Sequence, residues 1–253
     1  MAPLIQPRQV PAAHGAQWVR SGALWLLQSP FGWLSCTTLW IFFAVVSLLF
    51  PLLGPVAFSL TLPGIFAGFM LGCAAIEREQ SLKPRHLFEA FKRQPRKLMQ
   101  LGLINLTGET LLSLILLLWS GPQILNNSAP NASLMEQMQA SLPAFTTPTL
   151  ILVLVQLALL MMSWFTPILL IYTPLTTLNA LSASTYACLN NLPAFAVYAL
   201  TMILLLAAVG LISSWLPWLV GPLGILMMSL IIASVYASCR DIFVDLGPAT
   251  QPE

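Results

Sequence analysis

The chain has 253 residues, of which 58% are hydrophobic and 7% are charged, and its formal net charge is +2. A soluble domain carries about 25% charged residues, so this chain has too few polar side chains to cover its surface and must have lipid as its solvent. The composition therefore predicts an integral membrane protein, and the small net charge gives no indication of nucleic-acid binding.

In chain order, the sequence predicts a tail, a membrane domain and a second tail. Residues 1–15 are expected to form a disordered tail, and residues 1–29 lack the short apolar core and cleavage site of a signal peptide. Runs of about 20 apolar residues, the length that crosses a hydrocarbon core, predict six spans in one domain over residues 16–243. The approximate bounds of the spans are 31–53, 55–75, 96–119, 148–172, 193–214 and 219–238. A disordered tail over 244–253 is expected to follow.

The positions of Lys and Arg predict the orientation in the membrane. Seven of the ten lie in the connection 77–97 between the second and third spans, whereas the connection 120–147 has none. Cytoplasmic loops carry an excess of Lys and Arg. Both termini and 77–97 are therefore expected in the cytoplasm, and 120–147 is expected to form an outer loop.

A short segment with helical periodicity precedes each odd-numbered span, as in AQWVRSGALWLLQ and TTLNALSASTYACLNNL. In LKPRHLFEAFKR, Leu87, Phe88 and Phe91 fall on one face and charged side chains on the other, which is typical of a helix that lies at a membrane surface. The first segment carries Trp18 and Trp25, which suit the membrane–water boundary.

The odd-numbered spans open with similar phrases, QSPFGWL, RQPRKLM and NLPAFAV, and each span has a proline near its start. We therefore predict an all-α protein with three parallel repeats, related by an axis along the membrane normal. Each repeat consists of an interfacial helix and a two-helix hairpin. The alternative is that the prolines only mark helix starts, because the first helical position tolerates proline.

Gly64, Gly68 and Gly72 form a GxxxGxxxG pattern in the second span. This spacing places the three glycines on one helix face, where another helix can approach closely. The alternative is a functional hinge, with a kink at Pro63.

The order of the short motifs resembles that of a family of bacterial inner-membrane proteins without an assigned activity. The motifs are W-x-x-x-G, S-P-x-x-W, PLLGP, the glycine pattern, HLFEAF, N-N-x-P-A-F and YASCRDIF, and they extend from about residue 14 to 244. A fainter likeness extends to the membrane domain attached to some glycerophosphodiester phosphodiesterases. The resemblance implies six helices in the cytoplasmic membrane and carries over no ligand, cofactor or catalytic residue.

Glu109 lies near the middle of the third span, where a charged acid costs about 3 kcal/mol on an insertion scale. Eleven Leu or Ile residues in the same span favour its insertion into the membrane by roughly 5–6 kcal/mol, which exceeds the cost of the acid. Asn105 and Ser113 share a helix face with Glu109, and Gln156 in the fourth span lies at a similar depth. These four are candidate ligand-binding residues. The alternative is a protonated glutamate that only joins helices.

Basic residues of the connection 77–97 are candidates for contact with anionic lipid headgroups, and the alternative is that they only fix the topology. These candidates are Lys83, Arg85, Lys92, Arg93, Arg96 and Lys97. The four cysteines fall at cytoplasmic ends of the spans or in a cytoplasmic connection, where thiols stay reduced, so no disulfide is predicted. The sequence has no CxxC pattern, which is the spacing that would indicate a metal site.

No motif for a nucleophile, a phosphate loop or a catalytic metal is present, so no enzyme, no catalytic residue and no cofactor are predicted. The preferred hypothesis is a non-catalytic membrane component that organises lipids or partner proteins. The alternative is a small-molecule or ion transporter with a site near Glu109. A cavity around Glu109 would favour transport, and tight packing there would favour the organising role.

Overall fold

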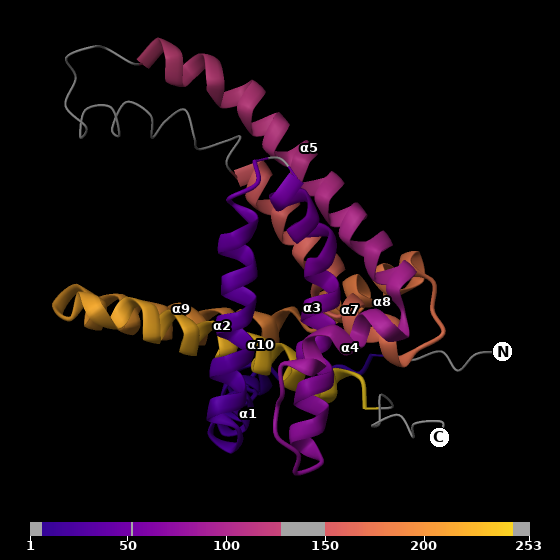
Figure 1. Cartoon of the computed structure of the whole chain (residues 1–253). Coiled ribbons are helices and arrows are strands. Elements are labelled where there is room, and N and C mark those ends of the chain that lie inside the picture. Colours follow the sequence, from indigo (N-terminus) through magenta and orange to yellow (C-terminus); the bar gives the residue numbers. More distant parts are fainter. Residues whose placement is uncertain (1–6, 52, 128–149, 245–253) are drawn as a thin grey trace.

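The computed structural model of the chain describes residues 7–51, 53–127 and 150–244, with the backbone alone for 119–127 (Figure 1). These residues form helices and irregular connections, without a strand. The helices are α1 (His14–Gln28), α2 (Pro30–Ser47), α3 (Leu53–Glu77), α4 (Arg85–Arg93), α5 (Pro95–Asn127), α7 (Thr166–Tyr172), α8 (Thr177–Asn190), α9 (Leu192–Trp215), the 3-10 turn η1 (Pro217–Leu219) and α10 (Val220–Ile242).

Six helical segments of the described residues are long and apolar enough to cross a membrane, which confirms the predicted all-α fold with six membrane-length helices. Their bounds are Pro30–Ser47, Leu53–Glu77, Pro95–Leu118, Leu150–Tyr172, Leu192–Trp215 and Pro217–Ile242. The fourth segment consists of helical residues 150–164 and of α7, separated by a bend at Phe165.

Two predicted boundaries are corrected. The first span ends at Ser47 rather than at residue 53, because the chain turns directly after Ser47. The loop predicted from residue 120 starts later, because α5 continues to Asn127. The rest of that loop, 128–147, lies outside the described residues, as does most of the predicted C-terminal tail.

Buried side chains gather at one end of the spans. In α3 they extend from Pro63 to Ile76, and in α10 from Met227 to Ile242. The buried residues of α2 and α9 lie near the first turns of those helices. The short helices α1, α4 and α8 pack at this same end, which we call the basic end because the connection 78–97 with its seven Lys and Arg lies there.

Each short helix packs against the second span of another hairpin. Helix α4 packs on α3, α8 packs on the fourth span, and α1 packs on α10. The first contact uses the predicted glycine face, because a Cβ at Gly68 would lie 2.5 Å from Cα of Leu87. The third contact is similar, since a Cβ at Gly22 would lie 2.9 Å from the backbone N of Ser234. Close helix approach at the glycine pattern is therefore confirmed, and its partner is α4.

The breaks between short helices and odd-numbered spans are also alike. Ser29 and Gln94 precede the prolines of α2 and α5 with nearly equal dihedral angles, φ −142° and ψ 59° against φ −139° and ψ 57°. The Ser29 hydroxyl accepts a hydrogen bond from the Leu82 N–H, just before α4, at 3.2 Å. The Asn191 side-chain oxygen accepts one from the Val10 N–H, just before α1, at 2.8 Å. In both hydrogen bonds, the residue that follows one short helix contacts the segment just before another short helix. A threefold repeat would produce equivalent contacts of this kind, and the repeat itself stays a prediction.

The N-terminal segment is part of the fold from Arg8 onward, which corrects the later part of the disordered tail predicted over residues 1–15. Residues 1–6 lie outside the described residues. Arg8 forms an ion pair with Asp241 at the end of α10. The same carboxylate accepts hydrogen bonds from His14 at 2.7 Å and from the Trp18 indole at 2.8 Å. Trp18 is 2% exposed. It therefore packs in the core of the protein and not against lipid, and its depth in a membrane stays a prediction.

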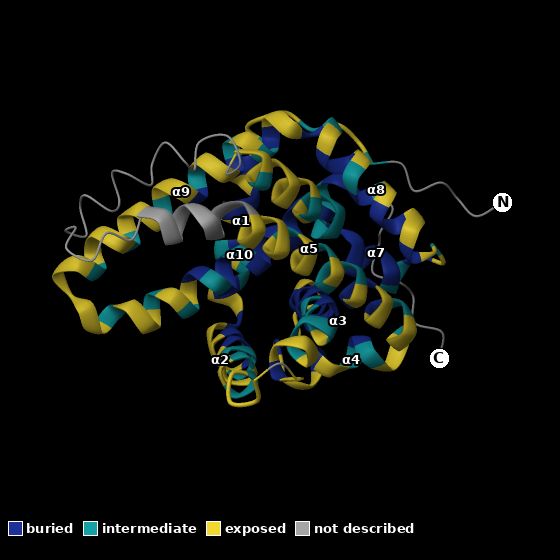
Figure 2. Cartoon of the chain, turned by 90° about the horizontal axis from the view of Figure 1, so that it is seen from above, coloured by how far each residue is buried: buried dark blue, intermediate teal, exposed yellow. Residues whose placement is uncertain are grey.

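The hairpins spread apart with distance from the basic end. Helix α9 lies at a steep angle to α2 and α3 in Figure 1, and the view from above agrees (Figure 2). Figure 2 shows exposed residues along most of α9. Leu204, Leu211 and Trp215 are 62%, 65% and 80% exposed, so this half of the hairpin offers its apolar surface to lipid.

The close contact of α3 with α4 makes Gly68→Ala a sharp test. The added methyl meets backbone atoms of Leu87, which cannot rotate away, so we expect a loss of about 1–3 kcal/mol in unfolding free energy. Gly210→Ala is the matched control, because nothing lies within 4 Å of a Cβ there. Thermal unfolding of the purified variants measures both. A Gly68→Ala protein as stable as the Gly210→Ala protein would contradict the contact.

Candidate functional site

Glu109 borders a cavity between the spans. The cavity has a volume of about 270 Å³, is bordered by α3, α5, the fourth span and α10, and is open on one side, where Glu109 is exposed. Asn105, Glu109 and Gln156, three of the four predicted residues, line it together with Ser163 and Trp164. Most other lining side chains are apolar, so the polar groups form a small cluster in a hydrophobic wall.

Ser113 does not line this cavity and is exposed, which corrects its place in the predicted cluster. Ser163 takes that role instead, because its hydroxyl donates a 2.7 Å hydrogen bond to the side-chain oxygen of Asn105 and so joins α5 to the fourth span. The sequence carried a signal for Ser163. It lies seven residues after Gln156, which places both on one face of the same helix.

A second cavity, of about 520 Å³, lies between α2, α3 and α10 and also contains Glu109. Leu62 and Glu109 line both cavities, so the carboxylate stands at their junction. Within the part of the chain that the structure describes, Glu109 has no hydrogen-bond or ion-pair partner. It therefore does not act there as the interhelical contact that the alternative interpretation requires.

Each of the two cavities also contains an unpaired indole. Nε1 of Trp164 in the first cavity and Nε1 of Trp40 in the second are buried and have no hydrogen-bond partner among the described residues. A buried donor without a partner costs roughly 1–3 kcal/mol, and native proteins rarely leave one unexplained. Both nitrogen atoms are covered by neighbouring side chains, so the indoles contribute aromatic walls to the two cavities and not accessible donors.

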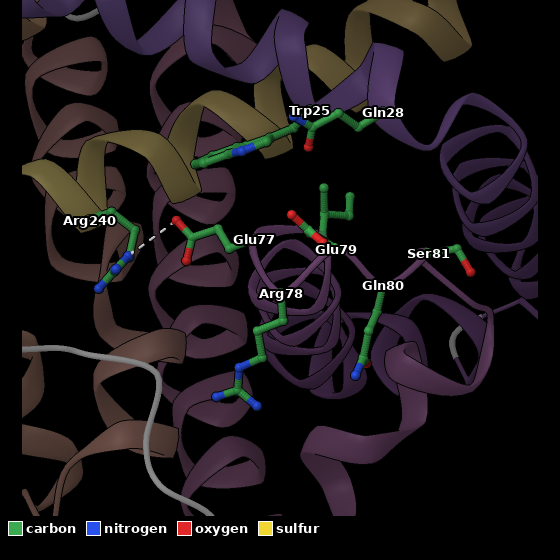
Figure 3. A pocket seen from close by; sticks show the side chains of 9 residues that line it. Trp25, Gln28, Glu77, Arg78, Glu79, Gln80, Ser81 and Arg240 are labelled. Carbon is green, nitrogen blue, oxygen red and sulfur yellow. Dashed lines mark hydrogen bonds and ion pairs between the residues drawn. The ribbon is translucent and has the colours of Figure 1, made fainter.

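Another cavity, with a volume of about 800 Å³, lies at the basic end. Figure 3 shows Glu77 and Arg240 facing each other beside Trp25. Arg240 Nε lies 3.3 Å from Glu77 Oε1, and the Tyr236 hydroxyl donates to Glu77 Oε2 at 2.9 Å. Arg240 and Tyr236 of α10 are thus both bonded to the Glu77 carboxylate, and these bonds join α3 to α10. Sequence reasoning missed the pair, because the two residues are 163 positions apart.

Glu79, at the edge of this cavity, has φ 60°. It follows the last turn of α3, where the Gln80 N–H donates to the Ala75 carbonyl at 3.0 Å. This is the hydrogen bond that closes a helix through one left-handed residue. The positive φ of Glu79 is thus explained by helix termination.

The six predicted headgroup contacts divide into two groups. Arg85 and Arg93 line a fourth cavity of about 130 Å³ beside α3, together with Arg78, which was not among the candidates. The remaining four do not line it, namely Lys83, Lys92, Arg96 and Lys97.

The four cysteines are buried and free. Burial raises the pKa of the Cys188 thiol in α8 to about 12, so this thiol stays protonated at neutral pH and is a poor nucleophile. Among the described residues, no three His, Cys, Asp or Glu side chains lie close enough to hold a metal ion.

Comparisons of the chain with protein-family models, curated proteins and solved structures gave no match. The resemblance to bacterial inner-membrane proteins therefore stays a prediction, and the function of the site has to be argued from its geometry.

The hydrogen bond between Ser163 and Asn105 predicts a measurable difference between two serines. Ser163→Ala removes a bond between two spans, and such bonds contribute about 0.6 kcal/mol on average. Ser113→Ala removes an exposed hydroxyl from the same region and is expected to leave the unfolding free energy unchanged. Unfolding of both variants in detergent, followed by circular dichroism, measures the difference. Equal stability of the two would argue against the bond.

Proposed function

We propose that the chain is a non-enzymatic protein of the bacterial cytoplasmic membrane that binds a lipophilic organic cation at Glu109 and carries it across the membrane. The observation that carries this proposal is the junction of two cavities at an unpaired carboxylate. Both termini lie in the cytoplasm in this proposal, because the seven Lys and Arg of 77–97 are at the basic end.

The chemistry of the walls favours a cation with apolar groups. A carboxylate attracts a positive charge most strongly where water is scarce. Aromatic faces attract organic cations as well, and each cavity contains two aromatic side chains, Phe66 and Trp164 in the first and Trp40 and Phe58 in the second. The remaining walls suit the apolar part of such a molecule.

A single carboxylate also offers a simple way to couple transport to protons. When Glu109 binds a proton, its charge is lost and a cation is released. When the proton leaves, a cation can bind again. Proton and cation thus compete for one group, and acids inside membrane spans commonly serve such pathways.

The second candidate is the non-catalytic component that organises lipids or partner proteins. Helix α4 favours it, because α4 is fixed on α3 by its buried face while Lys92 is exposed. The exposed position of Phe88 on the same helix adds an apolar contact for lipid. In this case Glu109 would have no effect on the activity.

Binding of radiolabelled tetraphenylphosphonium to the purified protein in nanodiscs tests the first proposal. Wild-type protein is expected to bind the probe, because the carboxylate attracts the positive charge. Glu109→Gln keeps the shape but cannot ionise, so its affinity is expected to be lower by about tenfold or more, the equivalent of 1.4 kcal/mol.

Glu79→Gln is the matched control, since it makes the same chemical change at the basic end, far from either intramembrane cavity. It is expected to bind the probe as the wild type does. If Glu109→Gln and wild type bind with equal affinity, the cation proposal fails and the organising role becomes the better one.

A further inference from the structure

A groove with an apolar lining lies between α2, α3 and α4. Its volume is about 490 Å³, which is within the range of about 300–1,000 Å³ that is usual for ligand sites. We call it the phenylalanine groove, because five phenylalanine side chains are among the residues that line it. These are Phe43, Phe50, Phe58, Phe88 and Phe91.

The walls of the phenylalanine groove offer little to a polar ligand. Two of its lining residues carry hydroxyl groups, and both hydroxyls donate hydrogen bonds within their own helices. Ser47 donates to the Ala44 carbonyl at 2.6 Å, and Thr61 donates to the Ala57 carbonyl at 2.9 Å. No charged side chain is among the described residues that line the groove. It therefore suits a hydrocarbon chain, which has no hydrogen bond to make, and differs from the cavities that Glu109 lines.

The groove extends from α4 to the start of α3. At the α4 end, the ring of Phe91 packs on Gly64 of α3, because a Cβ at that glycine would overlap the ring. Phe88 of α4 contacts Phe43 of α2, with ring centroids 6.1 Å apart. At the other end, Gly54 lies in the first turn of α3. Two rings of α4 are thus packed against the first hairpin at one end of the groove.

The length of the groove matches one leaflet of a membrane. Gly54 and Ile65 both line it and are eleven residues apart in α3, which is about 16 Å along the helix axis. Half of a hydrocarbon core of about 30 Å is about 15 Å. Because α3 is one of the six membrane-length helices, a groove of this length can take one acyl chain of a lipid in a single leaflet.

Positive charge borders the α4 end of the groove. Arg85 lies three residues before Phe88 and Lys92 lies four residues after it, so all three are neighbours on the helix surface, and all three are exposed. Glu89 is ion-paired with Arg93 at 2.9 Å, so α4 as a whole keeps a net charge of +2. A lipid headgroup at this end needs no place inside the groove, because long basic side chains can reach it from the helix surface.

We propose that the phenylalanine groove holds one acyl chain of an anionic phospholipid, whose headgroup is bound by Arg85 and Lys92. The chain lies along α3, and the headgroup lies against α4. Basic segments at a membrane surface attract anionic lipids, and the groove adds a defined place for the chain. The proposal does not depend on the cation site at Glu109, and it assigns a place to the lipid contact of the second candidate function.

Native mass spectrometry of the full-length protein tests the proposal, in micelles with equal amounts of dioleoyl phosphatidylglycerol and dioleoyl phosphatidylcholine. The two lipids have the same acyl chains, and only phosphatidylglycerol has a net negative charge. The wild type is expected to retain one phosphatidylglycerol in preference to phosphatidylcholine. Ala57→Trp places a ring in the groove, so retention is expected to fall by about tenfold or more. Ala207→Trp is the matched control, because Ala207 is exposed on α9 and does not line the groove.

Lys92→Gln tests the headgroup contact without altering the groove, and it remains informative if the Ala57→Trp protein folds poorly. Loss of one positive charge near the headgroup is expected to lower the preference for phosphatidylglycerol about fivefold. Arg20→Gln removes an exposed charge from the short helix α1, which does not line the groove. This control is expected to keep the wild-type preference.

Equal retention by the Ala57→Trp and Ala207→Trp proteins would place the acyl chain elsewhere and overturn the proposal. Equal binding of the two lipids by the wild type would do the same for the headgroup contact. A wild-type dimer that Ala57→Trp dissociates would mean that a second copy of the chain fills the groove, which also overturns the proposal. Ala57 and Lys92 line neither cavity at Glu109, so these outcomes are separate from those of the cation proposal.

Discussion

The close approach of the short helices to the spans is the constraint on which the rest of the structure depends. Gly68 and Gly22 let α4 and α1 pack directly on the backbones of α3 and α10. Without a hydrophobic force between helices in lipid, close packing and hydrogen bonds must hold them together. These contacts concentrate the core at the basic end. The outer halves of the hairpins are then free to spread, and the cavities around Glu109 lie where they begin to separate.

Polar groups reinforce the same end. Asp241 accepts hydrogen bonds from the N-terminal segment, and Glu77 joins α3 to α10 through Arg240. Both carboxylates have several partners, so they stabilise the contacts between hairpins. Glu109 differs from them because it has none among the described residues. This contrast between acids with partners at the packed end and an exposed acid without one between the spans supports the proposal that Glu109 binds a ligand.

The sequence was sufficient for features that depend on local pattern. Hydropathy predicted six membrane-length helices, and the spacing of glycines predicted the close contact near Gly68. The candidate site was partly predicted, because Asn105 and Glu109 share a helix face and Gln156 has a similar depth. The replacement of Ser113 by Ser163 was missed, since it depends on how α5 rotates against the fourth span. The burial of Trp18 was missed for a similar reason, because its partner Asp241 lies 223 residues away.

The contact between α1 and α10 also has a consequence for how the protein is made. Ribosomes deliver the N-terminal helix first and the last span last, so α1 leaves the ribosome long before its packing partner exists. The contact of α4 with α3 needs only a short stretch of chain and can form early. The contact of α1 with α10 can form only after α10 has left the ribosome. Until then Trp18 and Val19 remain apolar and unpacked, so the nascent chain must keep α1 at the lipid surface or under the protection of a chaperone.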